Sequence, residues 1–408
     1  METIEWEYSR EVFGEGCATQ EILDFANMVF SMEYGRTDFA ALLPKAYSPE
    51  RCGIVTHHMI WEEDRIKALV DLYPMTLRLQ GEAASSVSVR AAYVGTVSVH
   101  PGARGRGYMI ELMKRAEEDA RDQGCALMIL DGERHRYQYY GFERAGIRYD
   151  FRIESGNIRH CCAKLYQKEY MAAPVFRFEA LEADSPHLDF LYGLYQRKLV
   201  TARSREAFWW CLQSYSASAY VVLRDGAPVG YVDLSEDQGA LCEFEMIESG
   251  DYCRMLYDLM EAFGMEQLRV SVGMDEMDKM MELERACDSC NAAMSHQIKI
   301  LDYEAVLAFL LSWKQKYDTL VISDYVLGIR DAQTDNTEKY QLSVTEDGIR
   351  VSRTERAADT VLEQMELVRV LTTPFCFAEQ QKGEQGKIKN APAGWFPLPF
   401  YLPEADTF

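Results

Sequence analysis

A glycine- and arginine-rich turn between a strand and a helix is the part of this sequence that most directly indicates chemistry. The residues before the turn alternate as in a strand, and helical spacing of apolar residues begins directly after it. Glycines let the backbone turn tightly and present its N–H groups, and the start of a helix favours an anion. The turn therefore predicts a pyrophosphate site. The strand and turn residues expected to hold the cofactor that carries this pyrophosphate are Val97, Val99, Arg104, Gly105, Arg106, Gly107 and Tyr108.

Two other phosphate-binding motifs do not fit the same segment. A dinucleotide turn needs a third glycine, but position 110 is Ile, and the Gly-Lys-Ser/Thr of a nucleoside triphosphate loop does not occur here. The order Arg104-x-x-Gly107 after a strand resembles the acetyl-CoA-binding motif of the GNAT superfamily of N-acetyltransferases. A plain connecting turn is the alternative, because a lone Gly-x-Gly carries little weight.

A tyrosine-rich segment follows about thirty residues after the turn, behind the apolar run 125–130, which predicts a buried strand. Acyl transfer from a thioester to an amine needs an acid that protonates the departing thiolate, and a phenol is a suitable donor. The GNAT pattern Tyr-x-x-aromatic-Gly-aromatic, which the segment resembles, assigns the general acid to Tyr137. Tyr139 and Tyr140 are alternatives, and all three rings also suit simple packing.

Composition limits the class of protein and its partners. The 408 residues exceed one ordinary core, so two or three domains are expected, and a hydrophobic content of 48% indicates globular folding. The 65 acidic and 43 basic residues give a net charge of −22. This charge argues against nucleic acid or an anionic membrane as the main partner and suits a cationic substrate, although it also serves solubility.

The cysteine and histidine patterns indicate neither disulfides nor a metal. Eleven scattered cysteines and a start without a cationic or apolar signal segment predict a reduced, cytoplasmic protein. The apolar stretch 306–313 is too short to span a bilayer. Cys287-x-x-Cys290 lacks a second ligand pair and is interpreted as structural. His57 and His58, adjacent on a predicted strand, point to opposite faces and cannot chelate one metal ion.

The chain divides into three blocks of α/β type with mixed sheets. In the first block, residues 1–165, strands and helices surround the turn, and a strand at 149–159 is expected to close it. The second, 166–299, contains a hairpin with the turn Asp225-Gly226 and repeats the first without its pyrophosphate turn. The third, 300–408, is expected to hold a helix at 303–317, a strand meander, and helices at 358–370 and 374–382. It resembles a sterol-carrier-protein-like domain.

The order of these blocks resembles the Eis (enhanced intracellular survival) family of acetyltransferases over essentially the full chain. The local marks are 39–47, 97–110, 137–142 and a chain that stops at an aromatic residue, with Met109 at a position where the family commonly has a large aliphatic side chain. The resemblance implies tandem GNAT-like domains, a sterol-carrier-like tail domain, acetyl-CoA as co-substrate and a homo-hexamer.

The resemblance also implies site residues. The free carboxylate of Phe408 would be the base, threaded back into the first domain, and Glu33 and Asp406 would be the acidic substrate-binding residues. The expected activity is acetylation of primary amines on a polycation such as an aminoglycoside or polyamine, without a metal. A protein lysine acetyltransferase and a non-catalytic acyl-CoA- or lipid-binding protein are the alternatives.

Overall fold

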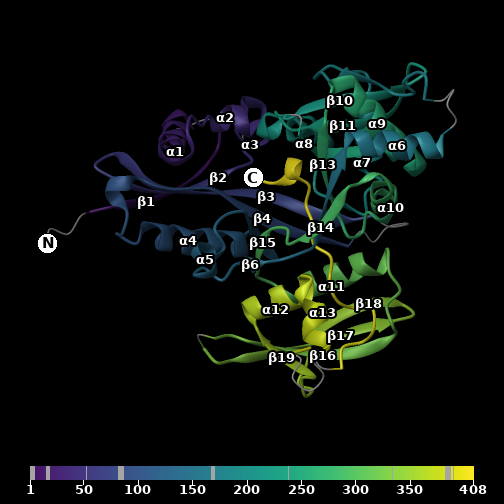
Figure 1. The fold of residues 1–408 in the computed structure, drawn as a ribbon. Helices are drawn as coiled ribbons and strands as arrows, with labels where there is room; N and C mark the ends of the chain where they lie inside the picture. Colours follow the sequence, from purple (N-terminus) through teal and green to yellow (C-terminus); the bar gives the residue numbers. More distant parts are fainter. Residues whose placement is uncertain are drawn as a thin grey trace.

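The structure is a computed structural model, and it describes residues 5–14, 19–51, 53–80, 87–166, 171–237, 239–332, 334–381, 387–388 and 390–408. Its architecture is α/β, with three sheets and helices packed on each (Figure 1). Among the described residues, no helix is both long and apolar enough to cross a bilayer.

The first sheet has helices on both faces, with α1 to α3 on one side and α4 and α5 on the other (Figure 1). The strand order is β1-β2-β3-β4-β5-β15-β6, and β9 pairs with β3. Both faces of the long strand β3 are buried, with Val70 toward α4 and Tyr73 toward the opposite core. The strands are β1 Glu7–Val12, β2 Thr56–Glu62, β3 Arg65–Leu79, β4 Ser88–Val99, β5 Leu127–Leu130, β6 Glu143–Arg144, β9 Val200–Thr201 and β15 Gln297–Ile300. The helices are α1 Thr19–Tyr34, α2 Phe39–Leu42, α3 Pro44–Tyr47, α4 Tyr108–Asp122 and α5 Arg134–Gln138.

The second sheet has the order β14-β7-β13-β12-β11-β10-β8. The expected hairpin is confirmed: β10 and β11 are antiparallel, and Asp225 and Gly226 between them both have positive φ, as a two-residue hairpin turn requires. The strands are β7 Arg148–Glu154, β8 Arg177–Ala180, β10 Ser218–Arg224, β11 Ala227–Leu234, β12 Ala240–Met246, β13 Gln267–Gly273 and β14 Ser289–Ala293. The helices are α6 Ser155–Leu165, α7 Leu188–Tyr195, α8 Arg205–Leu212, α9 Tyr252–Phe263 and α10 Met277–Ala286.

The third sheet has the order β18-β17-β16-β19. The expected meander is present, but the helix predicted from 358 begins only at 364, because residues 360–363 form a strand parallel to β16. The Tyr325 hydroxyl donates to that of Thr360 at 2.8 Å, which fixes this strand. The strands are β16 Ser323–Arg330, β17 Thr337–Thr345, β18 Gly348–Arg353 and β19 Thr360–Glu363. The helices are α11 Tyr303–Gln315, α12 Gln364–Thr372 and α13 Phe375–Gln381; the last residue of the helix predicted at 374–382 lies outside the described residues.

The first two sheets exchange strands. The strand expected to close the first block is β7, but it pairs with β13 and β14 in the second sheet, so that prediction is wrong. The first sheet instead takes β15, from the end of the second block, between β5 and β6. Ile298 of β15 is completely buried in the first core. Each of these two sheets therefore contains a strand from the part of the chain that forms most of the other sheet.

The C-terminal segment leaves the third sheet and ends beside the first sheet (Figure 1). Trp395, Leu398 and Phe400 along this path are buried, at 0 to 1% exposure. From residue 395 the tail is thus packed into the molecule except at Glu404, which is exposed, in contrast to the fraying that is common at chain termini.

The exchange predicts that the two sheets unfold together. Ile298→Ala should lower the free energy of unfolding by about 3 kcal/mol, because it leaves a cavity in a packed core. Amide hydrogen exchange should rise in β5 and in β13 alike. The control is Ile322→Ala at a side chain that is 61% exposed. Loss of protection in β5 alone would contradict the prediction.

Candidate active site

A cavity of about 890 Å³ opens where two neighbouring strands of the first sheet separate. β4 and β5 are parallel and paired from Ala91 to Tyr93, and β4 then continues to Val99. A bulge occurs in this continuation: Asp71 lies opposite Gly95 and Leu69 opposite Ser98, so β4 has one residue more than β3. Thr96 within the bulge has φ +52°. The bulge turns β4 away and leaves space between the strands.

The predicted glycine turn forms one wall of this cavity. Gly105 and Gly107 have φ of +79° and +83°, a backbone conformation that residues with a side chain rarely adopt. Gly107 is the N-cap of α4. Arg104, Gly105, Gly107 and Tyr108 line the cavity together with Val97 and Val99 from β4. The sequence motif therefore gathers around one space, with the N-terminal end of α4 directed at it.

Arg106 has a different place from the one expected. Its guanidinium donates to both carboxylate oxygens of Glu62, at 2.7 and 3.0 Å, and to the Gly102 carbonyl at 2.9 Å. It is not among the residues that line the cavity. The Tyr108 hydroxyl also donates to Glu62, so this residue offers its ring to the cavity and its hydroxyl to β2. Arg106 therefore fixes the turn to the sheet.

Glu33 lies at the cavity wall in contact with the turn. Its carboxylate is 2.5 Å from the guanidinium of Arg104, and both side chains are about half exposed. The predicted substrate-binding carboxylate and the predicted coenzyme-binding arginine are thus partners of each other. An anion that binds Arg104 must compete with Glu33 for the same donor groups.

Tyr137 extends from α5 into the cavity, and of the three tyrosines in this segment it is the one that lines it. Its ring packs against Gly132, where a Cβ atom would lie 2.5 Å from the ring. Burial raises the pKa of Tyr137 to about 12, so its hydroxyl stays a proton donor at neutral pH. Tyr139 is 71% exposed.

Phe408 reaches the same cavity from the other end of the chain. Its ring stacks on Tyr73 with 5.2 Å between centroids. It also packs on Gly95 so closely that a Cβ atom there would lie 2.4 Å from the Phe408 ring. Phe408 is 9% exposed, and it lines the cavity with Tyr137 and Tyr215. The second block of the chain, residues 166–299, also contributes here through Tyr215, whose hydroxyl accepts a hydrogen bond from that of Thr407 at 3.1 Å.

Buried cations hold the tail in this position. The Lys45 ammonium donates to the carbonyls of Ala405, at 2.9 Å, and Thr407, and burial lowers its pKa to about 8. Arg203 binds the Asp406 carboxylate at 2.6 Å. Asp406 is 5% exposed and does not line the cavity, so the structure does not support it as a substrate contact. It anchors the tail instead.

Sequence reasoning missed a buried polar chain behind the bulge. His57 Nδ1 lies 2.6 Å from one oxygen of Asp71, and the Tyr47 hydroxyl donates to the other at 2.6 Å. The same hydroxyl is 2.7 Å from the Thr96 hydroxyl. All four residues are buried. The signal in the sequence was Asp71 within an otherwise apolar run, since a buried carboxylate requires partners.

The histidine pair behaves as its strand position predicts. His57 faces Asp71, whereas His58 faces the other side of the sheet, where its Nδ1 lies 2.9 Å from the Tyr8 hydroxyl.

The two cysteines of the Cys-x-x-Cys sequence lie in different elements: Cys287 is the C-cap of α10, and Cys290 lies in β14. Within the described chain, no group of three or more His, Cys, Asp or Glu residues is arranged to hold a metal ion.

Comparison with known proteins identifies the first unit. Residues 17–145 match the family model for the acetyltransferase (GNAT) domain, so the chain carries a GNAT domain and is an acetyltransferase. No curated protein matches the chain at a significant level.

Solved structures share the fold over nearly the whole chain. A GCN5-related N-acetyltransferase from Kribbella flavida has 16% identity and a TM-score of 0.66, covering 99% of both chains. Eis1 from Mycobacterium abscessus has 16% identity and a TM-score of 0.62, covering 98% of this chain and 100% of its own. A probable N-acyltransferase from Enterococcus faecalis V583 has 14% identity and a TM-score of 0.66, covering 97% and 100%. The chain thus has an Eis-like fold.

The contact between Gly95 and Phe408 yields a test of tail docking. Gly95→Ala should displace the ring, because its methyl group would overlap the Phe408 ring. Release of Phe408 by a carboxypeptidase should become at least about tenfold faster. A loss of about 1.4 kcal/mol in the free energy of tail docking raises the undocked fraction of the protein tenfold. Gly156→Ala, with open space around its Cβ position, is the control. An unchanged rate of release would show that the ring is not held there.

Proposed function

We propose that this protein transfers the acetyl group of acetyl-CoA directly to a primary amine, with Tyr137 as the acid and the Phe408 carboxylate as the base. The observation that carries the proposal is the meeting of the glycine turn, Tyr137 and the chain's last residue in one cavity. These three elements are separated by up to about three hundred residues of sequence, so no local packing requirement brings them together.

The proposed place of the coenzyme follows from the turn. The pyrophosphate would lie against the backbone N–H groups of 105–107 at the start of α4, where the helix dipole favours negative charge. Arg104 is the basic side chain that lines the cavity at this point. The pantetheine arm would run along Val97 and Val99 in the space opened by the bulge, which leads the thioester toward Tyr137.

The chemistry then needs three proton transfers. An ammonium group that enters the cavity gives a proton to the Phe408 carboxylate, and the resulting amine attacks the thioester carbonyl carbon. As the carbon–sulfur bond breaks, the thiolate takes the proton of the Tyr137 hydroxyl, and the proton lost by the new amide nitrogen restores that hydroxyl. A raised pKa suits Tyr137 to this role, because the phenol remains protonated until the thiolate forms.

The wall on the acceptor side supports an amine with an apolar body. The side chains contributed by α1, α2 and the residue after α2 are mostly aliphatic or aromatic, and they are Val29, Phe30, Glu33, Tyr34, Phe39, Leu42 and Leu43. Burial of apolar surface against such a wall contributes roughly 25 cal/mol per Å². We therefore propose that the acceptor places one ammonium group at the terminal carboxylate and an apolar group against α1 and α2.

The charges of the cavity support the same acceptor. Glu33 is paired with Arg104, and Glu133 lies 3.5 Å from Arg136. Asp131 accepts hydrogen bonds from Tyr93 and His296. The terminal carboxylate has no ion pair within the described part of the chain. The polycationic acceptor expected from the sequence, an aminoglycoside or polyamine, would find one such carboxylate there and is the competing candidate.

Tyr137→Phe tests the proposed acid. It should lower kcat about a hundredfold or more, the usual contribution of a general acid, and change the KM for acetyl-CoA less than about threefold. Release of coenzyme A thiol in the presence of amines measures both. Tyr139→Phe, at an exposed ring of the same segment, is the matched control.

Two outcomes of this assay would count against the proposal. If Tyr137→Phe keeps half of the turnover, Tyr137 is not the acid. If a chain with two residues added after Phe408 works at the wild-type rate, the Phe408 carboxylate is not the base. Binding of acetyl-CoA without turnover on any amine would instead indicate a non-catalytic acyl-CoA-binding protein.

A matched pair of amines tests the acceptor. 2-Phenylethylamine should have a kcat/KM at least about tenfold above that of ethylamine, because burial of about 100 Å² of ring contributes about 2.5 kcal/mol. Leu42→Asp should reduce this ratio, since Leu42 lines the wall. Spermidine and kanamycin serve as polycationic comparators. A kcat/KM for spermidine above that for 2-phenylethylamine would favour the polycationic acceptor.

A further inference from the structure

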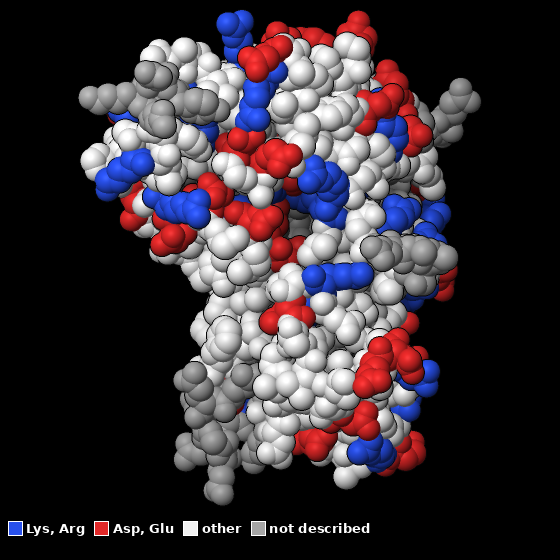
Figure 2. Space-filling model, turned by 90° about the vertical axis from the view of Figure 1, so that its right-hand side faces the viewer, with Lys and Arg blue, Asp and Glu red and all other residues white. Residues whose placement is uncertain are grey.

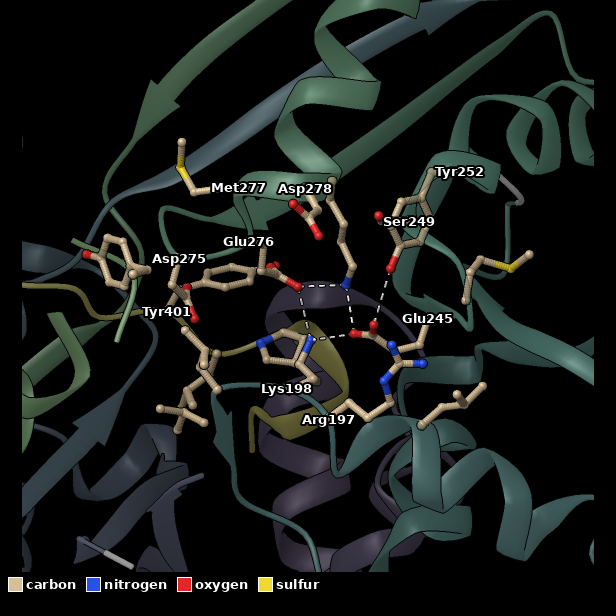
Figure 3. Close-up of a pocket in the computed structure, with 18 of the residues that line it drawn as sticks. Arg197, Lys198, Glu245, Ser249, Tyr252, Asp275, Glu276, Met277, Asp278 and Tyr401 are labelled. Carbon is tan, nitrogen blue, oxygen red and sulfur yellow. Dashed lines mark hydrogen bonds and ion pairs between the residues drawn. The ribbon is translucent and has the colours of Figure 1, made fainter. Parts of the chain in front are cut away.

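A second cavity, of about 570 Å³, is lined largely by residues of the second block, 166–299 (Figure 3). β12 and β13 are parallel and paired at Ala240 and Leu241, as β4 and β5 are, and the cavity is lined where these strands end. The start of α9 follows β12 as α4 follows β4. α11 of the third unit and the C-terminal segment close the remaining side.

The second cavity is not a copy of the coenzyme site. Its strand-to-helix turn reads Glu248-Ser-Gly-Asp251 where the first unit has arginines and glycines. Asp251 is the N-cap of α9, and its carboxylate is engaged by Arg224. This turn lacks the arginines and the Gly-x-Gly of the coenzyme turn, so we expect a ligand other than a pyrophosphate.

Two lysines and two glutamates form the floor of the cavity (Figure 3). Lys198 lies 3.1 Å from Glu245 and 3.2 Å from Glu276, and Lys279 lies 2.7 Å from each. Each ammonium thus has two carboxylates and each carboxylate two ammoniums. The four charges sum to zero and pair with one another, so this group does not by itself attract a charged ligand.

Asp275 is a carboxylate of the cavity that lies outside this group. One of its oxygens accepts the indole N–H of Trp313 at 3.0 Å, and it forms no ion pair within the described chain. Burial and the neighbouring charge of Glu276 raise the pKa of Asp275, although the hydrogen bond from Trp313 and the charge of Lys198 act in the opposite direction. Figure 3 places Asp275 beside Tyr401, on the side of Glu276 away from Glu245.

The surroundings of Asp275 fit a cation. The Tyr317 hydroxyl is buried in the cavity wall and has no hydrogen-bond partner among the described residues. Trp313, Tyr317 and Tyr401 contribute three aromatic rings to the same cavity. A carboxylate, a hydroxyl oxygen without a hydrogen-bond partner and aromatic rings are groups that recognise an organic ammonium ion, by charge, hydrogen bond and cation–π attraction.

We propose that the second cavity binds a small organic cation, whose ammonium group lies between the Asp275 carboxylate and the Tyr317 hydroxyl. Its volume falls in the range of small-molecule sites. The cavity is separate from the one that holds Phe408, and the proposal does not depend on acetyl transfer. Figure 2 shows Lys and Arg interspersed with Asp and Glu on the face of the molecule that it draws.

The test is a ¹⁹F NMR titration of the full-length protein with 4-fluorobenzylamine at pH 7.5, without acetyl-CoA. Asp275→Asn retains an oxygen for the Trp313 indole but removes the charge, and it should weaken binding at least tenfold. Tyr317→Phe should weaken it about threefold. Asp278→Asn, at an exposed carboxylate on the cavity rim, is the matched control and should stay within twofold.

The outcome is read from binding alone. Each variant is first shown to bind acetyl-CoA as the wild type does, which establishes its fold and the first cavity. Loss of one population of bound amine in Asp275→Asn, with Asp278→Asn unchanged, supports the site. Identical titrations for the wild type and Asp275→Asn would overturn it, including the case in which the amine binds only in the first cavity.

Discussion

The position of the chain's last residue depends on a buried ion pair between two parts of the molecule. Arg203 is 1% exposed and binds Asp406 of the tail and Glu243 of β12, at 2.6 Å each. Removal of one partner from a buried ion pair costs about 3–5 kcal/mol when the remaining charge is left unpaired; here Glu243 would still bind Arg203, so the loss of Asp406 should cost less than that. Asp406 is therefore important for the proposed mechanism without touching a substrate: it fixes the place where the carboxylate of Phe408 can lie.

A second constraint acts on the opposite wall. Thr96 has a left-handed backbone conformation, which costs a β-branched residue on the order of 1–3 kcal/mol. Its hydroxyl is bonded to Tyr47, and Tyr47 to the buried pair of Asp71 and His57. These bonds hold the bulge that separates β4 from β5. The ring of Phe408 packs on Gly95 at the start of the same bulge, so the strained backbone and the docked tail support one geometry.

Local patterns in the sequence predicted the local parts of this site. The strand, the glycine turn and α4 follow from spacing and φ requirements, and so does the hairpin at Asp225-Gly226. The exchange of β7 and β15 was not predictable, because strand pairing across about 150 residues leaves no periodic signal. The same holds for side chains whose role depends on a distant partner: Arg106 was assigned to the coenzyme but binds Glu62, and Asp406 to the substrate but binds Arg203.

The tail forms a wall of both cavities, through Phe408 in the first and Tyr401 in the second, and this raises the question of whether they are coupled. Asp406, which binds Arg203, lies between these two residues in the sequence and also lines the second cavity. Coupling between ligand sites is typically about 1–3 kcal/mol. A cation in the second cavity would therefore lie beside the residue that fixes the position of the terminal carboxylate, and the two cavities share this anchor.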